Sequence, residues 1–423
     1  MAACLYCTAK DGSKRMEVTY DKALTAKGRH ILHVVAAGEF GGAEAQILAL
    51  TRGLQATGET TVTVATYYEG EFSKRLREAS ITTHVLHSRN PLGDVRTLRD
   101  LAKTVQPDLI HTHGVRASLA GRLVGYALHI PVITTVHSDL YYDYASPVKR
   151  NLMMQLERRT RHLSRRVIAV SGALKEVLVA RGYEVQKITV VRNGLDVETA
   201  LAKLKAAELR PVELRRTLGL SPQAQLLLCV ARLHPVKGHD FLLRAFANVK
   251  QDPNRSLHLV LVGDGAQRDA LITRATELSL YGHDDSAMDQ HEMHRALQRV
   301  HFLGERHDVF ALLLEANAFV LTSQMEALGI APLEAMLAGL PVIATRVGGM
   351  QEIVFEGEEA TGILVPYADV DALTRAIEQL FADPALRKRM GTFGQRHVLQ
   401  SFTQKRMVEE TLSVYAAERT LGR

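Results

Sequence analysis

The chain has 423 residues, of which 46% are hydrophobic and 23% are charged, and this composition excludes intrinsic disorder over most of its length. It contains no run of eighteen uncharged apolar residues, which excludes a membrane-spanning helix, and its first thirty residues lack the apolar core of a signal peptide. Three cysteines are too few for a disulfide scaffold. We therefore expect a cytoplasmic protein of two domains, or of three if each has only about 150 residues.

Two segments lack the pattern of a folded domain. Residues 1–28 are polar and aperiodic, and we expect them to be disordered. Within this tail Cys4 and Cys7 form a Cys-x-x-Cys pair, but no second pair completes a zinc site, so we interpret them as incidental. Residues 279–296 carry several histidines and acids without the spacing of metal ligands, which predicts a surface loop.

The rest of the chain alternates short β-branched runs with helical patterns, which predicts parallel sheets with helices on both faces. One sheet of thirteen strands would be unusual, and the turn at 192–196 followed by a charged stretch divides the chain in two. We expect an N-terminal domain over 29–205 and a C-terminal domain over 206–403. The predicted strands are 30–36, 61–65, 82–86, 109–111, 132–136, 167–170 and 188–191, then 226–230, 257–262, 300–303, 318–321, 341–344 and 362–365.

The net charge is +6, and seven basic residues with one acid gather between Lys149 and Arg166. The spacing of the apolar residues between them predicts one helix with a stripe formed by Met153, Leu156, Thr160, Leu163 and Val167. Its opposite, cationic face is either a solvated surface or a contact for anionic lipid or a phosphorylated acceptor. Nucleic acid is disfavoured as a partner, because aromatic residues make up only 5% of the chain and do not alternate with the arginines.

Ligands of open α/β sheets bind beyond the carboxyl ends of the strands. After the first strand, Gly41 and Gly42 open a helix, where the backbone can approach a phosphate closely. The loop is not a Gly-x-Gly-x-x-Gly fingerprint, and Tyr67 and Tyr68 stand where a dinucleotide site would place an acid. An NAD-dependent dehydrogenase is therefore disfavoured.

Two histidines end strands of the first half. His137 follows the fifth strand, at the edge where ligands are expected, and is a candidate site residue, whereas we interpret His113, after the fourth, as structural. Tyr141, Tyr142 and Tyr144 follow His137, and their rings either pack in the loop or stack on an acceptor's sugar or lipid.

In the second half, Arg232 and Lys237 share one loop after the first strand, and two cations there can clamp a diphosphate. Gly263 and Arg306 follow the next two strands. We expect all of these loops to lie at one edge of the sheet.

The loop after the fourth strand of this half leads into a helix that begins near Gly329, with Ile330 and Ala331 in its first turn. Free amides at a helix start attract an anion. Glu326 precedes this helix and Glu334 lies within it, so both carboxylates can face the hydroxyls of a ligand whose phosphate caps the helix.

Together these motifs resemble the retaining GT-B glycosyltransferases of family 4, from about Ile31 to about Glu418. The resemblance implies two Rossmann-like domains that face each other across a cleft, with a nucleotide-diphosphate sugar held mainly by the second. The motifs that carry it are Gly41-Gly42-Ala43-Glu44, Val170-Ser171, Asn193-Gly194-Leu195-Asp196, Arg232 with Lys237-Gly238, Val262-Gly263-Asp264-Gly265, Glu326-x7-Glu334, and Gly348-Gly349 before Glu352.

The resemblance also assigns roles. Arg232 and Lys237 match the diphosphate-binding pair, Glu334 the glutamate that holds the ribose, and Glu326 the one that contacts the transferred sugar. His137 matches a histidine near the reacting centre, Gly42 matches the loop beside the phosphates, and the last helix, about 404–419, is expected to return across the N-terminal domain. Gly41, Gly263, Arg306, Gly329, Ile330 and Ala331 complete the expected donor site, and Tyr141, Tyr142 and Tyr144 the acceptor side.

Two departures from the family pattern are visible: Ala327 stands where glycine is common, and 279–296 is an insertion. We find no Asp-x-Asp triad after a strand, the usual mark of a metal-held donor, so we expect no metal and no cofactor. Retention is then implied to proceed by same-face attack, with the leaving phosphate taking the acceptor's proton.

The expected donor is a UDP-sugar, with GDP-mannose next, and the expected acceptor is a glycan or a lipid-linked glycan of cell-envelope polysaccharide or glycolipid synthesis. That acceptor would bring the protein to the inner face of the membrane as a peripheral protein. A nucleotide-sugar 2-epimerase of the same architecture and a non-catalytic nucleotide-sugar-binding protein are the alternatives.

Overall fold

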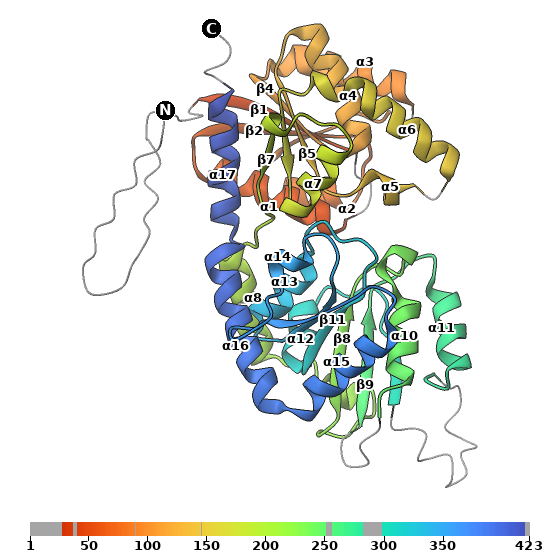
Figure 1. The fold of residues 1–423 in the computed structure, drawn as a ribbon. Helices are drawn as coiled ribbons and strands as arrows, with labels where there is room; N and C mark the ends of the chain where they lie inside the picture. Colours follow the sequence, from red (N-terminus) through yellow and green to blue (C-terminus); the bar gives the residue numbers. More distant parts are fainter. Residues whose placement is uncertain are drawn as a thin grey trace.

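The computed structural model describes residues 28–36, 40–88, 90–144, 146–250, 256–281 and 298–418. These residues form two α/β bodies, each built on one parallel sheet, as Figure 1 shows. The Cys-x-x-Cys pair, nearly all of the tail over 1–28 and most of the 279–296 segment lie outside the described residues. Among the described helices, none has the length of apolar sequence that crossing a bilayer requires.

The first body contains a seven-stranded sheet in the order β3-β2-β1-β4-β5-β6-β7. All of its neighbouring strands pair in parallel. Its strands are β1 (Arg29–Val35), β2 (Thr60–Thr66), β3 (Thr82–Val85), β4 (Leu109–His113), β5 (Val132–Val136), β6 (Arg166–Ala169) and β7 (Ile188–Val190). Its helices are α1 (Gly42–Ala56), α2 (Glu71–Glu78), α3 (Pro91–Val105), α4 (Val115–Leu128), α5 (Leu140–Asp143), α6 (Pro147–Thr160), η1 (Arg161–Leu163), α7 (Gly172–Ala180) and η2 (Val185–Lys187).

The second body contains a six-stranded parallel sheet in the order β10-β9-β8-β11-β12-β13. Its strands are β8 (Gln225–Val230), β9 (Leu257–Val262), β10 (Gln298–Phe302), β11 (Ala318–Leu321), β12 (Val342–Thr345) and β13 (Gly362–Val365). The helices of this half are α8 (Val197–Leu209), α9 (Leu214–Thr217), η3 (Pro235–Lys237), α10 (His239–Ala247), α11 (Arg268–Glu277), α12 (Val309–Glu315), α13 (Ile330–Leu337), α14 (Met350–Ile353), α15 (Val370–Ala382), α16 (Pro384–Ser401) and α17 (Gln404–Ala417).

All thirteen predicted strands are present, each within two residues of its predicted ends, and the two wound sheets confirm the predicted fold class. In both sheets the strand order reverses beside the first strand, between β1 and β4 and between β8 and β11. Such reversal points are where open α/β sheets bind ligands, so each body offers one at the edge where its strands end.

Each sheet is covered by apolar clusters on both faces. In the first body, Ile31 and Ile133 pack under α1 and α17, while Leu32 and Ile110 pack under α3 and α4. The second sheet packs in the same way against α8, α12, α13 and α16 on one face and against α10, α11 and α15 on the other. This burial on both faces explains why the strands read as continuous apolar runs.

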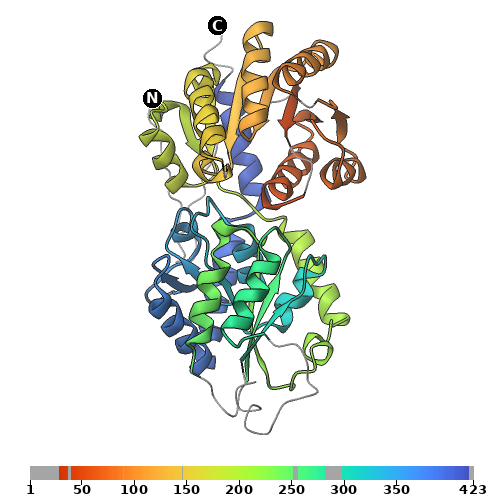
Figure 2. The ribbon, with the colours of Figure 1, turned by 90° about the vertical axis from the view of Figure 1, so that its right-hand side faces the viewer.

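The chain crosses between the bodies a second time near its end. After α16, which lies on α13 of the second body, α17 returns to the first body and packs against α1 (Figures 1 and 2). Met407 and Tyr415 of α17 are buried in the core of the first body, and the Gln404 amide donates to the carbonyl of Ala49. The last helix is therefore a structural part of the first body.

The single helix predicted over the basic segment is wrong. The helix α6 ends at Thr160 and is followed by the short turn η1, while Val167, the last residue of the predicted stripe, lies in β6. The chain turns into the sheet because the Arg165 amide donates to the Val132 carbonyl of the neighbouring strand. Arg165 and Arg166 then form ion pairs with the buried Glu418, although the Arg165 side chain remains 48% exposed.

Three histidines lie inside the core of the first sheet. His33 comes from β1, and His111 and His113 come from β4; none exposes more than 3% of its surface. Burial in an apolar core disfavours the charged imidazolium. It lowers the pKa of His33 to about 3 and holds the pKa values of His111 and His113 well below the usual value.

These buried imidazoles predict a loss of stability in weak acid. Between pH 6.5 and about 4 the unfolded chain binds protons at these histidines and the folded chain does not, so the free energy of unfolding falls as pH falls. Each such proton contributes about 1.4 kcal/mol per pH unit. Denaturant titrations over this range should show that slope, and His33→Leu should reduce it by about one proton. An unchanged slope in the variant would mean that His33 is protonated in the folded state.

Candidate donor and acceptor site between the two bodies

The strand ends of the two sheets face each other. Gly42, at the start of α1, lies opposite α13 of the second body, because a Cβ built at Gly42 would be 4.0 Å from the Ile330 side chain. Further along the cleft, burial raises the pKa of Asp143 on α5, and the charge of Arg232 in the second body is among the influences that lower it. The loops after β1 and β5 therefore meet the loops after β8 and β11.

A carboxylate of the second body holds the two bodies together. Glu352 of α14 accepts hydrogen bonds from the amides of Gly172 (2.7 Å) and Ala173 (3.3 Å), the first residues of α7 in the first body. Its other oxygen accepts from Nε of Arg192 at 2.7 Å. Glu352 thus occupies the positive N-terminal end of α7, where a carboxylate is stabilising.

Glu326 and Lys237, which the sequence placed in one site, are in direct contact. Lys237 Nζ donates to Glu326 Oε2 at 2.6 Å, and Ser323 Oγ donates to the same oxygen at 3.2 Å. Gly349 N donates to the Glu326 carbonyl at 3.0 Å. A Cβ at Gly348, whose φ is +49°, would lie 2.1 Å from that carbonyl. The Gly348-Gly349 pair therefore lets the two loops touch through their backbones.

The other two predicted cations of the second body, Arg306 and Arg232, differ in their contacts and exposure. Arg306 donates two hydrogen bonds to Asp308, at 2.8 and 2.5 Å, and is held beside it. Arg232 is exposed at the mouth of the β8 loop. That loop is fixed by Gly263, because a Cβ there would lie 2.1 Å from the carbonyl of Ala231, and Gly263 has a φ of +130°.

The helix α13 begins at Ile330 after Gly329, and no side chain caps its first amides. Uncapped amides at a helix start are donors for an anion. Glu334, one turn further, is partly buried, and desolvation raises the pKa of its carboxyl to about 7 although the charge of Lys203 acts in the opposite direction. In the described part of the chain we find no hydrogen bond to this carboxylate, so it is available to ligand hydroxyls. Ala331 lies between the start of α13 and Glu334, in the first turn of the helix.

His137 of the first body is not isolated. Its Nε2 lies 3.0 Å from Nδ1 of His113, and Nε2 of His113 lies 3.0 Å from Nδ1 of His33. Burial lowers the pKa of His137 to about 4, so the ring is neutral at physiological pH. The sequence interpretation of His113 as purely structural missed this contact; the alternation of histidines in His111-Thr112-His113 was the available signal.

A metal could be held in one place among the described residues, since His33, His111 and His113 have donor atoms within 4.8 Å of one another. Five of their six nitrogens already bond, to one another, to His137 Nε2, to Tyr415 Oη (2.6 Å from His111) or to Thr135 Oγ1 (2.7 Å from His111), and only Nε2 of His33 has no partner among the described residues. An Asp-x-Asp also exists a few residues after β13, at Asp369, but this carboxylate accepts from the Ala372 amide and caps α15. Asp371, the second acid of this Asp-x-Asp, is exposed.

The first body contains a cavity of about 440 Å³ next to His137. This volume is typical of a small-ligand pocket. Its wall is formed by residues of α4, β5, α5, α6 and α7, among them Val115, His137, Leu140, Asp143, Met154 and Leu178.

The predicted acceptor tyrosines lie outside the lining of this cavity. Arg150 lies 4.2 Å above the Tyr141 ring and Lys149 lies 5.3 Å above the Tyr144 ring, while Tyr142 packs edge-on against Tyr141. Their rings thus serve to join α5 to the start of α6.

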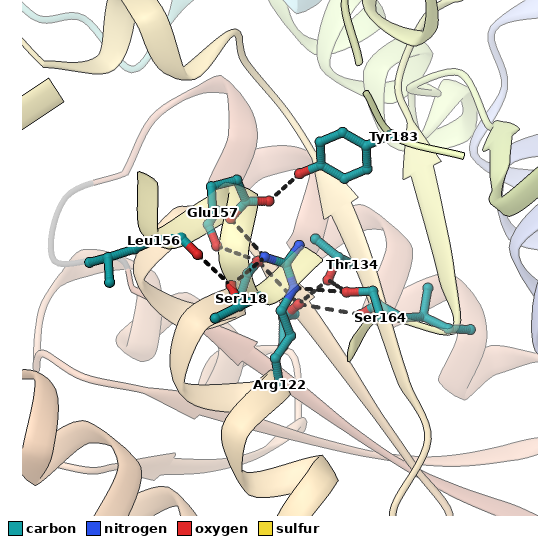
Figure 3. Close-up of polar contacts among 11 residues, drawn as sticks. Ser118, Arg122, Thr134, Leu156, Glu157, Ser164 and Tyr183 are labelled. Atoms are coloured by element: carbon teal, nitrogen blue, oxygen red, sulfur yellow. Dashed lines mark hydrogen bonds and ion pairs between the residues drawn. The ribbon is translucent and has the colours of Figure 1, made fainter. Parts of the chain in front are cut away.

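A buried polar network forms one side of the cavity (Figure 3). Arg122 of α4, which is fully buried, donates to Glu157 of α6 at 2.7 Å and to Ser164 at 2.8 Å, and the Tyr183 hydroxyl donates to the other oxygen of Glu157. Glu157 and Tyr183 both line the cavity. Removal of one partner would leave a buried charge unpaired, which is costly, so the network fixes this wall.

Comparison with known proteins places the chain in a family. The family described as "Glycosyl transferases group 1" matches residues 212–397, and that described as "Glycosyltransferase Family 4" matches residues 40–199. The alpha-maltose-1-phosphate synthase of Mycobacterium tuberculosis is 29% identical over 325 residues, covering 73% of this chain and 78% of the relative. The N-acetyl-alpha-D-glucosaminyl L-malate synthase of Bacillus anthracis is 26% identical over 328 residues, covering 75% of this chain and 77% of the relative.

Solved structures share the fold. The Anabaena protein HepE in complex with UDP-glucose superposes with a TM-score of 0.73 at 23% identity, covering 93% of this chain and 100% of that one. A glycosyltransferase from Rickettsia africae superposes with a TM-score of 0.75 at 22% identity, covering 93% and 99%. The two family matches, one on each body, and the shared two-sheet fold lead to one conclusion: this chain belongs to the GT-B glycosyltransferases of family 4.

Proposed function

We propose that this glycosyltransferase is a retaining, metal-independent enzyme that moves a sugar from a nucleotide diphosphate to a glycan or a lipid-linked glycan. The observation that carries the proposal is the contact of Lys237 with Glu326 beside the uncapped start of α13, the helix that also carries Glu334. A UDP-sugar is the proposed donor, with GDP-mannose second. The complex of HepE with UDP-glucose supports this choice.

The donor would bind mainly to the second body. Its diphosphate would lie between the free amides of α13 and the cations Arg232 and Lys237, which supply charge-assisted hydrogen bonds. In the ligand-free protein Lys237 forms an ion pair with Glu326. In the complex, Lys237 would contact the diphosphate and Glu326 would contact the transferred sugar. Gly41 and Gly42 leave room for the phosphates from the opposite side.

The proposed chemistry uses this charge distribution. The bond between the anomeric carbon and the diphosphate breaks, the acceptor oxygen bonds to the same face of that carbon, and the acceptor proton passes to the leaving phosphate. Negative charge then grows on the diphosphate, where Lys237, Arg232 and the helix amides are already oriented to receive it. No protein carboxylate is required as a nucleophile on this route.

The acceptor would enter from the first body. The cavity beside His137 has mixed walls, with apolar side chains such as Val115 and Leu178 and polar ones such as Asp143, which suits a sugar ring with its two kinds of surface. Its rim faces Arg232 across the cleft. This arrangement would bring an acceptor hydroxyl and the donor together at His137.

The two glutamates should separate in binding experiments. Glu334→Gln should weaken UDP binding about ten- to a hundredfold, because a carboxylate contributes strong hydrogen bonds to hydroxyls. Glu326→Gln should leave UDP binding unchanged or tighter, since it releases Lys237, but should lower turnover of the UDP-sugar. Calorimetry and steady-state rates measure both.

The pH dependence gives an independent check on Glu334. Its pKa near 7 in the free protein means that UDP binding must displace a proton below that pH. The affinity of the wild type should therefore fall more steeply as the pH drops below 7 than that of Glu334→Gln, in which only the phosphates of UDP titrate. Equal losses of UDP affinity in Glu334→Gln and Glu326→Gln, at any one pH, would refute the separate roles of the two glutamates in binding UDP and the sugar.

The activity itself is tested with radiolabelled sugar nucleotides and no acceptor, with and without EDTA. We expect slow hydrolysis that releases the sugar with its anomeric configuration retained and that EDTA does not reduce. An epimerised sugar nucleotide would identify a 2-epimerase instead, and tight binding without any turnover would identify a nucleotide-sugar-binding protein.

A lipid-linked acceptor would bring α6 to an anionic membrane. Val148 and Leu152, one turn apart on this helix, are 81% and 57% exposed; Lys149 lies beside Val148, and the exposed Arg158 and Arg159 lie near the end of the same helix. Apolar side chains among cations are typical of a peripheral membrane contact, in which each basic residue adds about 1 kcal/mol.

Flotation with anionic vesicles at low salt tests this contact. The wild type should float, and Val148→Asp/Leu152→Asp should not. Leu209→Asp is the matched control, because Leu209 is 77% exposed on α8 of the other body. A wild type that fails to float would leave a soluble glycan as the acceptor.

A further inference from the structure

Three imidazoles form a hydrogen-bonded line from the cleft into the core of the first body. His137 lies in the wall of the cavity, His113 lies behind it at the end of β4, and His33 lies behind His113 in β1. The nitrogen–nitrogen distance is 3.0 Å at each of the two contacts. The line is held laterally by His111, whose ring centre is 4.3 Å from that of His113 and 4.9 Å from that of His33.

His111 is itself fixed by residues that take no part in the line. Its Nδ1 lies 2.6 Å from the Tyr415 hydroxyl of α17, and its Nε2 lies 2.7 Å from the Thr135 hydroxyl of β5. The returning C-terminal helix therefore supports the histidines from one side and the sheet supports them from the other. None of the three rings in the line can rotate without breaking a hydrogen bond or displacing a neighbour.

A neutral imidazole carries one N–H and one bare nitrogen, so each contact in the line must pair a donor with an acceptor. Only two arrangements satisfy both contacts at once, and they have opposite directions. In one, Nδ1 of His137 carries the proton; in the other, it is bare. The protonation of Nδ1 of His137, a residue that lines the cavity, is therefore decided together with that of His33, in the core.

The far end of the line favours one direction. Nε2 of His33 is buried and has no hydrogen-bond partner among the described residues. Either direction leaves one buried N–H without a partner, at His33 or at His137, but only His137 lines the cavity, so only its N–H can be satisfied by a bound ligand. His33 then carries its proton on Nδ1 and donates to His113, and His113 donates to Nε2 of His137. Nδ1 of His137, which also lacks a partner, is left with a proton to donate.

We propose that His113 and His33 are positioning residues, which fix the ring orientation and the tautomer of His137 so that its Nδ1–H donates to an oxygen of the bound sugar nucleotide or acceptor. The catalytic part of this inference rests on the proposed function. The tautomer itself is a property of the ligand-free protein and is measured without any reaction.

Asparagine and glutamine differ in side-chain length, so replacing His113 with one or the other removes its two histidine contacts one at a time. In His113→Asn the amide occupies the place of Nδ1 and keeps a contact with His137, whereas in His113→Gln it occupies the place of Nε2 and keeps the contact with His33. If the line positions His137, kcat should fall about 10- to 100-fold in His113→Gln and much less in His113→Asn, with UDP affinity within threefold of wild type in both. Equal losses in the two variants would show that His113 acts only by packing and would overturn the proposal.

Nitrogen NMR of the full chain labelled at histidine reads the tautomers directly. We expect the wild type to show His137 protonated at Nδ1, and His33→Phe to convert this signal into a mixture of tautomers. The matched control is His301→Phe, which breaks a histidine contact of 3.2 Å with His258 in the second sheet and should leave His137 unchanged. A wild-type His137 that is bare at Nδ1, or one that is unaffected by His33→Phe, would refute the inference even if sugar transfer is confirmed. Conversely, an Nδ1–H on His137 that depends on His33, in a protein that transfers no sugar, would sustain the line and refute only the proposed function.

Discussion

The arrangement of the two bodies depends on one carboxylate at one helix end. Glu352 of the second body binds the first two amides of α7 in the first body and, with its other oxygen, Arg192. Those amides have no partner within their own helix, so a carboxylate satisfies donors that would otherwise require water. Beside this polar contact, Leu174 of α7 and Leu328 of the second body belong to one continuous apolar cluster. A directional contact within an apolar interface defines a specific geometry, and that geometry places Gly42 opposite Ile330 and Arg232 near Asp143.

The two sides of the cleft differ in charge. The second body provides cations, a carboxylate and a helix N-terminus, on loops that touch through their backbones at Gly238, Gly263 and Gly348. The first body provides histidines that burial keeps neutral. On the proposed function, the diphosphate would bind to the second body and the neutral His137 would face the sugar from the first. The division explains how two sheets of the same topology can have different roles in one reaction.

Glu334 is a candidate ligand-binding group whose burial destabilises the ligand-free protein. Its carboxyl is desolvated without a hydrogen-bond partner among the described residues, and its pKa rises to about 7. A desolvated carboxyl destabilises the ligand-free protein when it is ionised, and a hydrogen bond from a ligand hydroxyl would offset that desolvation cost. The same reasoning applies to the unpartnered nitrogens of His33 and His137.

The sequence by itself determined the elements and the edge at which the site lies. Thirteen strands could be placed because burial on both faces leaves continuous apolar runs, and the loop residues could be placed because parallel strands all end at one edge. The grouping of Lys237 with Glu326 followed from the same rule, since β8 and β11 are neighbours.

Only the tertiary structure decided the contacts that depend on register and on facing surfaces. The basic helix was predicted to be too long because its apolar spacing continues through η1 into β6, and only pairing with β5 shows where the helix ends. The line from His137 through His113 to His33 joins residues from three strands, and Glu352 reaches a helix nearly two hundred residues before it in the chain. Local spacing records which face of an element is apolar, whereas such contacts arise from the packing of whole elements, which no short stretch of sequence encodes.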